Sequence, residues 1–191
     1  MIRRLTQLTA TAAVLSYLSA APALAMTAWA VVPDETTVGF SAVDAGYPFT
    51  GEFEAYEADI LFDPANLDAS KVTVRIDLES ASTGAPDRDG SLPSGTWFDV
   101  KNHPTATYEA SQFKATGEGA YVAKGTLTLK GVTKPVDLPF TLKIDGNTAH
   151  VNGETALDRT TFNVGEGEYA SGETISKEVK VLIDLTAVRA E

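Results

Sequence analysis

The sequence predicts an all-β fold of eight antiparallel strands, and two observations carry that prediction. Apolar and polar residues alternate along most of the chain, which is typical of strands with one buried face. Short turn sequences separate the alternating runs, and no long helical pattern stands between them. A sheet of this kind either closes into a barrel or splits into a sandwich. Closure at eight strands removes exposed edges and leaves room inside for one small or slender ligand.

Three runs show the alternation most clearly, at residues 71–79, 136–145 and 179–185. In the first of them Val72, Val74 and Ile76 alternate with charged or polar neighbours, so one face of the strand is buried. The apolar phase shifts inside a longer run, as a one-residue insertion would cause, and a bulge is expected near Tyr56 and Glu57. The weaker runs that complete the predicted set cover residues 36–44, 49–62, 105–114, 120–130 and 148–157.

The connections favour an antiparallel meander. Asp145-Gly146-Asn147 and Gly117-Glu118-Gly119 are tight hairpin signals, and residues 130–135 are expected to form a third short return. Two stretches lack the alternation. Residues 81–104 are predicted to be a loop with one short helical turn, and residues 158–173 a second loop.

The composition limits the classes of function. The chain has 191 residues, which suits one globular domain, with 26 acidic and 15 basic residues, two histidines and no cysteine. A net charge of −11 offers no basic surface for nucleic acid or for an anionic membrane. The lack of cysteine excludes a disulfide scaffold, a thiolate nucleophile and a cysteine-bound metal.

Residues 1–25 are predicted to be a secretory signal peptide. Two arginines give a short basic start, the next stretch is rich in Ala, Leu and Thr, and small residues at Ala23 and Ala25 suit the signal peptidase. A cut after Ala25 leaves residues 26–191 as a single periplasmic domain with 13 basic and 26 acidic residues. The alternative is an uncleaved anchor, but polar residues interrupt the segment, and a span needs about twenty apolar residues. No stable membrane insertion is therefore expected after cleavage.

Side chains for catalysis or metal binding are scarce. His103 and His150 lack a supporting motif, and the acidic residues lack the spacing of a calcium loop. The densest charge cluster is Asp87-Arg88-Asp89, where the arginine favours a local ion pair or a head-group contact over an acid pair. The sequence therefore predicts no catalytic residue, no metal site and no cofactor.

The strand interiors leave two interpretations of the core open. Bulky aromatic residues are numerous enough to fill a small barrel. Six positions within the strand runs instead carry glycine or alanine, where a packed core would prefer larger side chains, and this favours an internal cavity. The small residues are Gly39, Gly51, Ala55, Ala110, Ala123 and Gly125.

Several motifs together resemble the YceI-like family of periplasmic polyisoprenoid-binding proteins. The most specific is the strand-turn-strand segment at residues 125–136, and the resemblance extends from about residue 29 to residue 187. It implies a lipocalin-like antiparallel barrel whose hydrophobic tunnel holds a long isoprenoid chain, and it also implies a homodimer. The other segments that carry it are residues 51–53, 60–64, 87–89, 97–99, 103–104, 106–108 and 158–162.

The resemblance and the inward phase of the strands together give a set of site residues. Arg88 and Asp89 are expected at the polar mouth of the tunnel. The sequence departs from many relatives at residues 43–46 and 90–93, where those relatives carry histidine. The residues expected to line the tunnel are Phe40, Phe53, Val74, Ile76, Trp97, Phe98, Tyr108, Leu127, Leu138, Phe140, Phe162 and Val181.

The sequence thus predicts a periplasmic carrier or sequestering protein that binds an isoprenoid quinone or a polyprenyl chain and performs no catalysis. The acidic balance favours a neutral, quinone-like head group over a pyrophosphate. Two alternatives stay open. One is a lipid-modifying enzyme with Asp87, Arg88 and Asp89 as its polar site, and the other is a secreted interaction module with a filled core.

Overall fold

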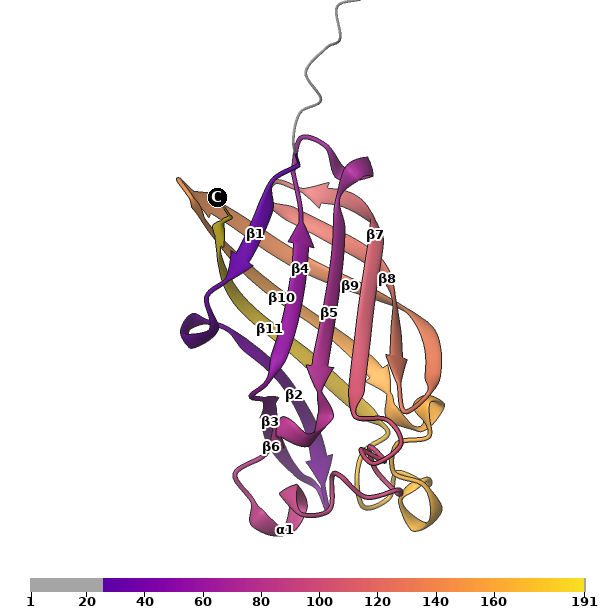
Figure 1. Ribbon diagram of the computed structural model, residues 1–191. Coiled ribbons are helices and arrows are strands. Elements are labelled where there is room, and N and C mark those ends of the chain that lie inside the picture. Colours follow the sequence, from indigo (N-terminus) through magenta and orange to yellow (C-terminus); the bar gives the residue numbers. More distant parts are fainter. Residues whose placement is uncertain (1–25, 191) are drawn as a thin grey trace, which may run out of the picture.

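The computed structural model describes residues 26–190, so the predicted signal peptide at residues 1–25 and the cut after Ala25 lie outside the described part. Eleven strands run through the described residues (Figure 1). They are β1 (Ala28–Val31), β2 (Thr37–Asp44), β3 (Tyr47–Phe53), β4 (Tyr56–Leu61), β5 (Lys71–Asp77), β6 (Ala81–Ser82), β7 (Thr105–Gly117), β8 (Ala120–Leu129), β9 (Val132–Asp145), β10 (Thr148–Asp158) and β11 (Glu178–Arg189).

Eight of these strands form a closed antiparallel ring. They follow one another in the order β1, β4, β5, β7, β8, β9, β10 and β11, and β11 pairs back to β1. The remaining strands, β2, β3 and β6, continue the sheet beside β11. The predicted eight-stranded antiparallel barrel is therefore confirmed, and the sandwich alternative is wrong.

Three positions around the ring are each built from two segments. The 3₁₀ turn η1 (Pro33–Glu35) separates β1 from β2, and both strands pair with β11. Glu54 and Ala55 separate β3 from β4, and η3 (Leu78–Ser80) separates β5 from β6. The eight predicted runs thus correspond to the eight positions. The prediction missed β1, because four residues are too few to show an alternating pattern.

Two local expectations need correction. The strand interruption lies at Glu54 and Ala55, and the shifted phase begins with Tyr56 as the first residue of β4, so the expected bulge at Tyr56 and Glu57 is wrong by two residues. The return expected at residues 130–135 is only two residues long, because Lys130 and Gly131 both adopt left-handed backbone and close a tight hairpin.

One stretch of the barrel wall has no backbone ladder. β1 pairs with β4 only through its first two residues, and β2 pairs with β3 only from Gly39 onward. Between these contacts, residues 30–38 and 53–59 share no backbone hydrogen bond in the described chain. We call this stretch the seam, and it coincides with the breaks in both strand positions.

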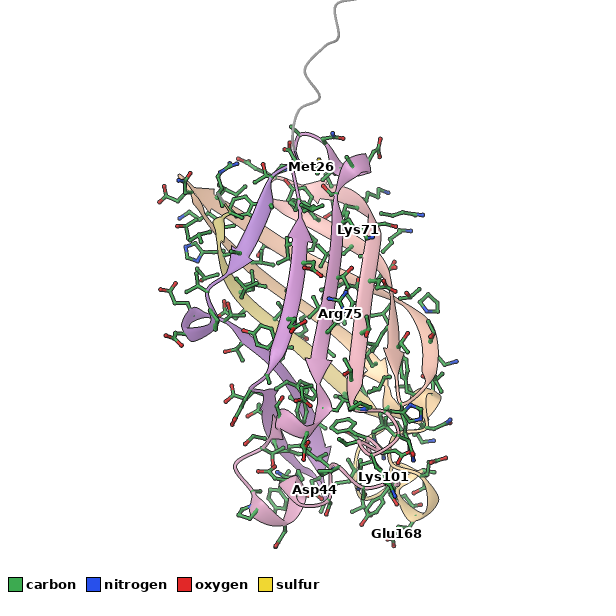
Figure 2. The ribbon with its side chains drawn as sticks, viewed as in Figure 1. Met26, Asp44, Lys71, Arg75, Lys101 and Glu168 are labelled. Carbon is green, nitrogen blue, oxygen red and sulfur yellow. The ribbon has the colours of Figure 1, made fainter. Side chains whose placement is uncertain are left out.

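One end of the barrel, the termini end, is formed by short connections. Met26 and Lys71 lie there (Figure 2), beside the 3₁₀ turn η2 (Leu67–Ala69). The hairpins predicted at residues 117–119 and 145–147 are confirmed at the same end, where β7 turns into β8 and β9 into β10.

The opposite end, the loop end, carries the long irregular segments. Asp44, Lys101 and Glu168 lie there (Figure 2). The segment between β6 and β7 contains the predicted short helical turn, α1 (Pro86–Asp89). The segment between β10 and β11 contains two 3₁₀ turns, η4 (Arg159–Phe162) and η5 (Gly167–Tyr169).

The hydrophobic core forms two clusters, one at each end. The loop-end cluster is centred on Leu78, which is 1% exposed, with Phe98 and Phe162 buried beside it. The termini-end cluster is centred on Trp29 and Phe62. The interior between the clusters is therefore the place where a barrel of this size can hold a ligand.

Candidate functional site

A cavity of about 290 Å³ lies inside the barrel. Its lining extends from Trp29 and Phe62 in the termini-end cluster to Trp97 and Phe162 in the loop-end cluster, so it runs along the barrel axis. Apolar side chains supply nearly all of that lining, because the inward-facing positions of the strands carry apolar residues. A cavity of this shape and polarity suits a slender apolar ligand.

All twelve side chains that the sequence placed in the tunnel lie in the lining of this cavity. Val74 and Ile76 reach it from β5, Leu138 and Phe140 from β9, and Val181 from β11. Their contact with a bound ligand stays a prediction. The other seven are Phe40, Phe53, Trp97, Phe98, Tyr108, Leu127 and Phe162.

The small residues do not create the cavity in the way the sequence suggested. Of the six, only Gly39 and Ala123 lie in the lining. A Cβ atom on Gly51 would overlap the Phe40 ring, and one on Gly125 would lie 2.6 Å from the ring of Tyr108. The absence of a side chain at these two glycines therefore makes room for the rings of Phe40 and Tyr108.

The termini end of the cavity is closed by aromatic rings on the strands. The Phe62 ring meets Phe113, Tyr121 and Phe140 at centroid distances of 5.2, 5.5 and 5.8 Å, each edge to face. The indole Nε1 of Trp29 donates a hydrogen bond of 2.9 Å to the Phe62 carbonyl oxygen, which holds the residue in place. This end is a packed aromatic plug.

The loop end is organised by a buried arginine that the sequence analysis left out of the site. Arg159 is 4% exposed and lines the cavity, and all five of its N–H groups donate to backbone carbonyls at distances of 2.6–3.1 Å. Burial lowers its pKa, and the nearby Asp158 opposes that shift. Its guanidinium lies 5.3 Å from the Trp97 ring centre. The accepting carbonyls belong to Val164, Gly165, Tyr169, Ile175 and Ser176.

A second cation ties the loops to the β8–β9 hairpin. The Lys130 side chain is 7% exposed, and its Nζ donates to the carbonyl oxygens of Gly95 at 2.7 Å and Asn163 at 2.6 Å. It also pairs with a carboxylate oxygen of Glu166 at 2.9 Å. Lys130 therefore joins both long loops to one turn of the sheet.

The two predicted mouth residues lie at the loop end but outside the cavity lining. The guanidinium of Arg88 lies 3.9 Å from the ring centre of Phe49, which does line the cavity, and 3.4 Å from an Asp44 carboxylate oxygen. A carboxylate oxygen of Asp89 accepts hydrogen bonds from the amide and hydroxyl of Thr83, and these bonds lower its pKa. Both residues thus serve local structure, and their contact with a head group stays a prediction.

Two tyrosines in the lining have buried hydroxyl groups. The Tyr108 hydroxyl lies 3.2 Å from the Val136 carbonyl oxygen and 3.3 Å from that of Ala123, and burial raises the pKa of Tyr108 to about 12. Tyr56 also lines the cavity, and burial raises its pKa while the Thr36 hydroxyl beside it opposes that rise. Neither hydroxyl could be found from the sequence, because the geometry of its partners depends on the closed barrel.

The two histidines lie outside the cavity lining. His150 Nδ1 lies 3.1 Å from the Thr186 hydroxyl, and His103 packs near Gly131. No group of three or more His, Asp or Glu side chains that could hold a metal occurs within residues 26–190. No helix in this part of the chain has the length and apolar character needed to cross a membrane.

The comparisons with known proteins agree with the geometry. The family model described as "YceI-like domain" matches residues 29–187. A UPF0312 protein of Ectopseudomonas mendocina is 32% identical over 159 residues, which cover 80% of this chain and 81% of that protein.

Solved structures show the same fold. BcnA of Burkholderia cenocepacia superposes with a TM-score of 0.80 at 29% identity, covering 83% of this chain and all of BcnA. A YCEI protein of Campylobacter jejuni gives 0.66 at 26% identity, covering 74% of this chain and 85% of that one. A domain from Saccharophagus degradans, described as polyisoprenoid binding and implicated in plant cell wall breakdown, gives 0.67 at 16% identity, covering 86% and 99%.

Proposed function

The chain belongs to the YceI-like family, and from that membership and the apolar cavity we propose that it binds an isoprenoid lipid as a periplasmic carrier or sequestering protein without catalysis. The cavity is the observation that carries the proposal, because it is elongated, enclosed by the ring and lined almost wholly by hydrocarbon. The Saccharophagus degradans domain, which has the same fold, supports the choice of ligand class.

Burial of the lipid chain supplies the binding energy. Removing apolar surface from water contributes about 0.8 kcal/mol per CH₂ group, or roughly 3–4 kcal/mol for each five-carbon isoprene unit before ordering costs. A lining without charged groups free to pair adds little selectivity of its own. Affinity is therefore expected to depend on chain length and on the fit to the cavity.

The electrostatics of the interior favour a neutral head group. Residues 26–191 carry 13 basic and 26 acidic residues, so the field of the protein repels a pyrophosphate. The cation in the lining, Arg159, has all its N–H donors bound to carbonyls and offers none to a phosphate oxygen. We therefore propose a quinone-like head in preference to a polyprenyl pyrophosphate.

The two alternative functions have less support. An enzyme would rely on the Asp87-Arg88-Asp89 cluster, yet Arg88 pairs with Asp44 and the carboxylate of Asp89 binds Thr83, outside the cavity. A pure interaction module would have a filled core, whereas this barrel holds a cavity between its two clusters. The predicted homodimer stays a prediction.

The direct test is a binding titration that compares the wild-type protein with a variant whose cavity is partly filled by a larger side chain. Ala58 lines the cavity from β4, so Ala58→Phe places a ring in the space that a lipid chain would use. We expect the wild-type protein to bind a ubiquinone with a multi-unit tail, and Ala58→Phe to lose at least about tenfold in affinity. The control is Glu57→Ala, which alters the exposed face of the same strand.

Two results would contradict the proposal. One is a wild-type protein that takes up neither the quinone nor a polyprenyl pyrophosphate of the same chain length. The other is tighter binding of the pyrophosphate than of the quinone at moderate salt, which would reject the neutral head group alone. The periplasmic location is tested separately, by finding a mature chain that starts at Met26 in a periplasmic extract.

A further inference from the structure

The two long connections at the loop end differ in how firmly they are held. The connection between β6 and β7 buries Leu92 and Phe98 in the loop-end cluster. The connection between β10 and β11 buries Phe162 and Val164 near its start, but none of its residues 167–173 is buried. We call residues 167–173 the flap.

Both stems of the flap are fixed to other segments. On the side before the flap, the Gly165 carbonyl oxygen accepts a hydrogen bond from Arg159, and the Gly165 amide donates to the Thr96 carbonyl oxygen at 2.8 Å. On the side after it, Arg159 donates to the Ile175 carbonyl oxygen at 2.7 Å. The Thr174 carbonyl oxygen accepts from an amide of the β2–β3 hairpin at 2.8 Å. One guanidinium thus holds both stems.

The flap itself has few ties to the rest of the protein. Within residues 26–190 one hydrogen bond leaves it, from Arg159 Nη2 to the Tyr169 carbonyl oxygen at 2.6 Å. Its own backbone bonds are internal, from the Ala170 amide to Gly167 and from the Gly172 amide to Tyr169. Gly167 and Gly172 have φ values of +66° and +81°, and glycine exchanges this conformation for others without steric cost. The flap is therefore free to turn about these two glycines while its stems stay fixed.

The flap closes the cavity through a contact between two rings. The ring centre of Tyr169 lies 5.0 Å from that of Trp97. Trp97 lines the cavity and Tyr169 does not, so the indole ring lies between the flap and the cavity. Glu168, the neighbour of Tyr169 in the chain, is among the outermost residues of the loop end (Figure 2). Trp97 is thus the inner layer of this closure and Tyr169 the outer layer.

We propose that the flap is the gate of the cavity. It swings outward about Gly167 and Gly172, Tyr169 leaves Trp97, and the Trp97 side chain turns into the space so freed, which admits or releases the lipid chain. Opening breaks one hydrogen bond of Arg159 and keeps the bonds from its guanidinium to both stems. The inference rests on the proposed function for the identity of the ligand that passes, while the movement itself is measured without a ligand.

Tyr121 provides a matched control at the termini end. Its ring packs against Phe62 and Phe140, each at a centroid distance of 5.5 Å. Phe62 and Phe140 line the cavity and Tyr121 does not, so Tyr121 covers lining aromatic residues as Tyr169 does. Tyr121 is carried by β8, which is paired on both sides, so it has no hinge about which to leave.

The movement is tested by labelling a single thiol inside the cavity. The chain has no cysteine, and Val136 lines the cavity within the loop-end cluster, so Val136→Cys gives one buried reactive group. In that background we expect Tyr169→Ala to speed labelling by N-ethylmaleimide about five- to tenfold, and Tyr169→Phe to keep the original rate because the ring is retained. Tyr121→Ala should leave the rate unchanged. Low urea should not speed the labelling, because flap opening exposes little surface.

The role of the gate is tested by ligand kinetics in the protein without the added cysteine. A ubiquinone with a multi-unit tail should associate with Tyr169→Ala and dissociate from it faster by the same factor, about five- to tenfold. The dissociation constant should stay within about twofold of the wild-type value, because Tyr169 does not line the cavity. A residue that only shaped the binding site would change the dissociation constant.

The outcomes separate this inference from the proposed function. Unchanged labelling in Tyr169→Ala would overturn the inference, as would an equal acceleration in Tyr121→Ala. Labelling that rises steeply in low urea would also overturn it, because the thiol would then be reached by unfolding of the whole barrel. Accelerated labelling of Tyr169→Ala in a protein that takes up no quinone would overturn the proposed function and support the flap movement.

Discussion

The two ends of the barrel are closed in different ways. At the termini end, aromatic rings carried by strands or lying directly beside them pack around Phe62 at centroid distances of 5.2–5.8 Å. At the loop end, irregular segments are held by Arg159 and Lys130, whose nitrogens donate to backbone carbonyls. The first closure depends on packing of apolar surface, and the second depends on hydrogen bonds to buried cations.

The difference has a consequence for ligand exchange. A plug built on strands opens only if the ring itself opens, whereas loops can move while the ring stays intact. Each loop-end cation joins segments outside the strand ladders of the ring, so these segments depend on side-chain contacts more than the strands do. The loop end is therefore the end where ligand entry is expected.

Removal of Arg159 should have the largest effect. Arg159→Leu removes the side-chain donor of five backbone carbonyl groups, two of them in fully buried bonds, and we expect a loss on the order of 5 kcal/mol in the free energy of unfolding. Arg159→Lys retains the charge, but its ammonium cannot reach five carbonyl oxygens. This variant should therefore keep only part of the stability that Arg159→Leu loses. Denaturant unfolding measures the stability of both variants. A loss below about 1 kcal/mol in Arg159→Leu would show that the loops do not depend on this cation.

Truncation of the aromatic plug should come next. Phe62→Ala removes the ring that three others surround, and a loss of about 3–4 kcal/mol is expected, against about 1 kcal/mol for the control Phe62→Leu. Amide hydrogen exchange sharpens the comparison between the ends. Phe62→Ala should reduce protection near the termini end, and the arginine variant should reduce it in residues 159–177. If both variants lost protection uniformly along the chain, the two ends of the barrel would not be closed independently of each other.

Lys130 should contribute less, because its ammonium makes fewer buried contacts. Lys130→Met keeps most of the apolar stem and loses the bonds to Gly95 and Asn163, so we expect a loss of about 1–2 kcal/mol in stability. The control is Lys180→Met, at an exposed pair with Glu154 on the barrel surface, where less than about 1 kcal/mol is expected. If the two variants lowered the unfolding temperature equally, the buried bonds of Lys130 would add nothing to stability beyond those of an exposed ion pair.

Asp158 should give the smallest effect, and one that depends on pH. Hydrogen bonds from Thr160 lower the pKa of Asp158 below its ordinary value, so the folded state favours the ionised carboxylate. This contribution to stability is present above about pH 4 and is lost as the pH falls through the lowered pKa. Asp158→Asn should therefore reduce the unfolding temperature at neutral pH more than at about pH 3, with Thr160→Val as the partner control. If Asp158→Asn changed the unfolding temperature equally at both pH values, the ionised carboxylate of Asp158 would not be the source of the stability.

The sequence predicts the ring well because hydrophobic alternation reports directly on which strand face is buried. The same phase places residues such as Val74, Leu138 and Val181 in the cavity lining, and the two tight hairpins follow from local turn chemistry. These features depend on neighbours close in sequence, so local pattern is sufficient to find them.

The features that the sequence does not predict depend on contacts between distant segments. Arg159 sits in a recognisable motif, but its partners lie in a loop without periodicity and become evident only when that loop folds around it. Gly51 and Gly125 look like empty space until the rings of Phe40 and Tyr108 are seen to cover them.

The central claim is that the cavity between the two clusters holds an isoprenoid quinone. It is tested most directly by native mass spectrometry of the protein purified from the periplasm of the cells that make it, followed by solvent extraction. We predict the mature chain, residues 26–191, with one quinone bound that the solvent releases. An empty protein that also takes up no quinone when challenged would contradict the claim.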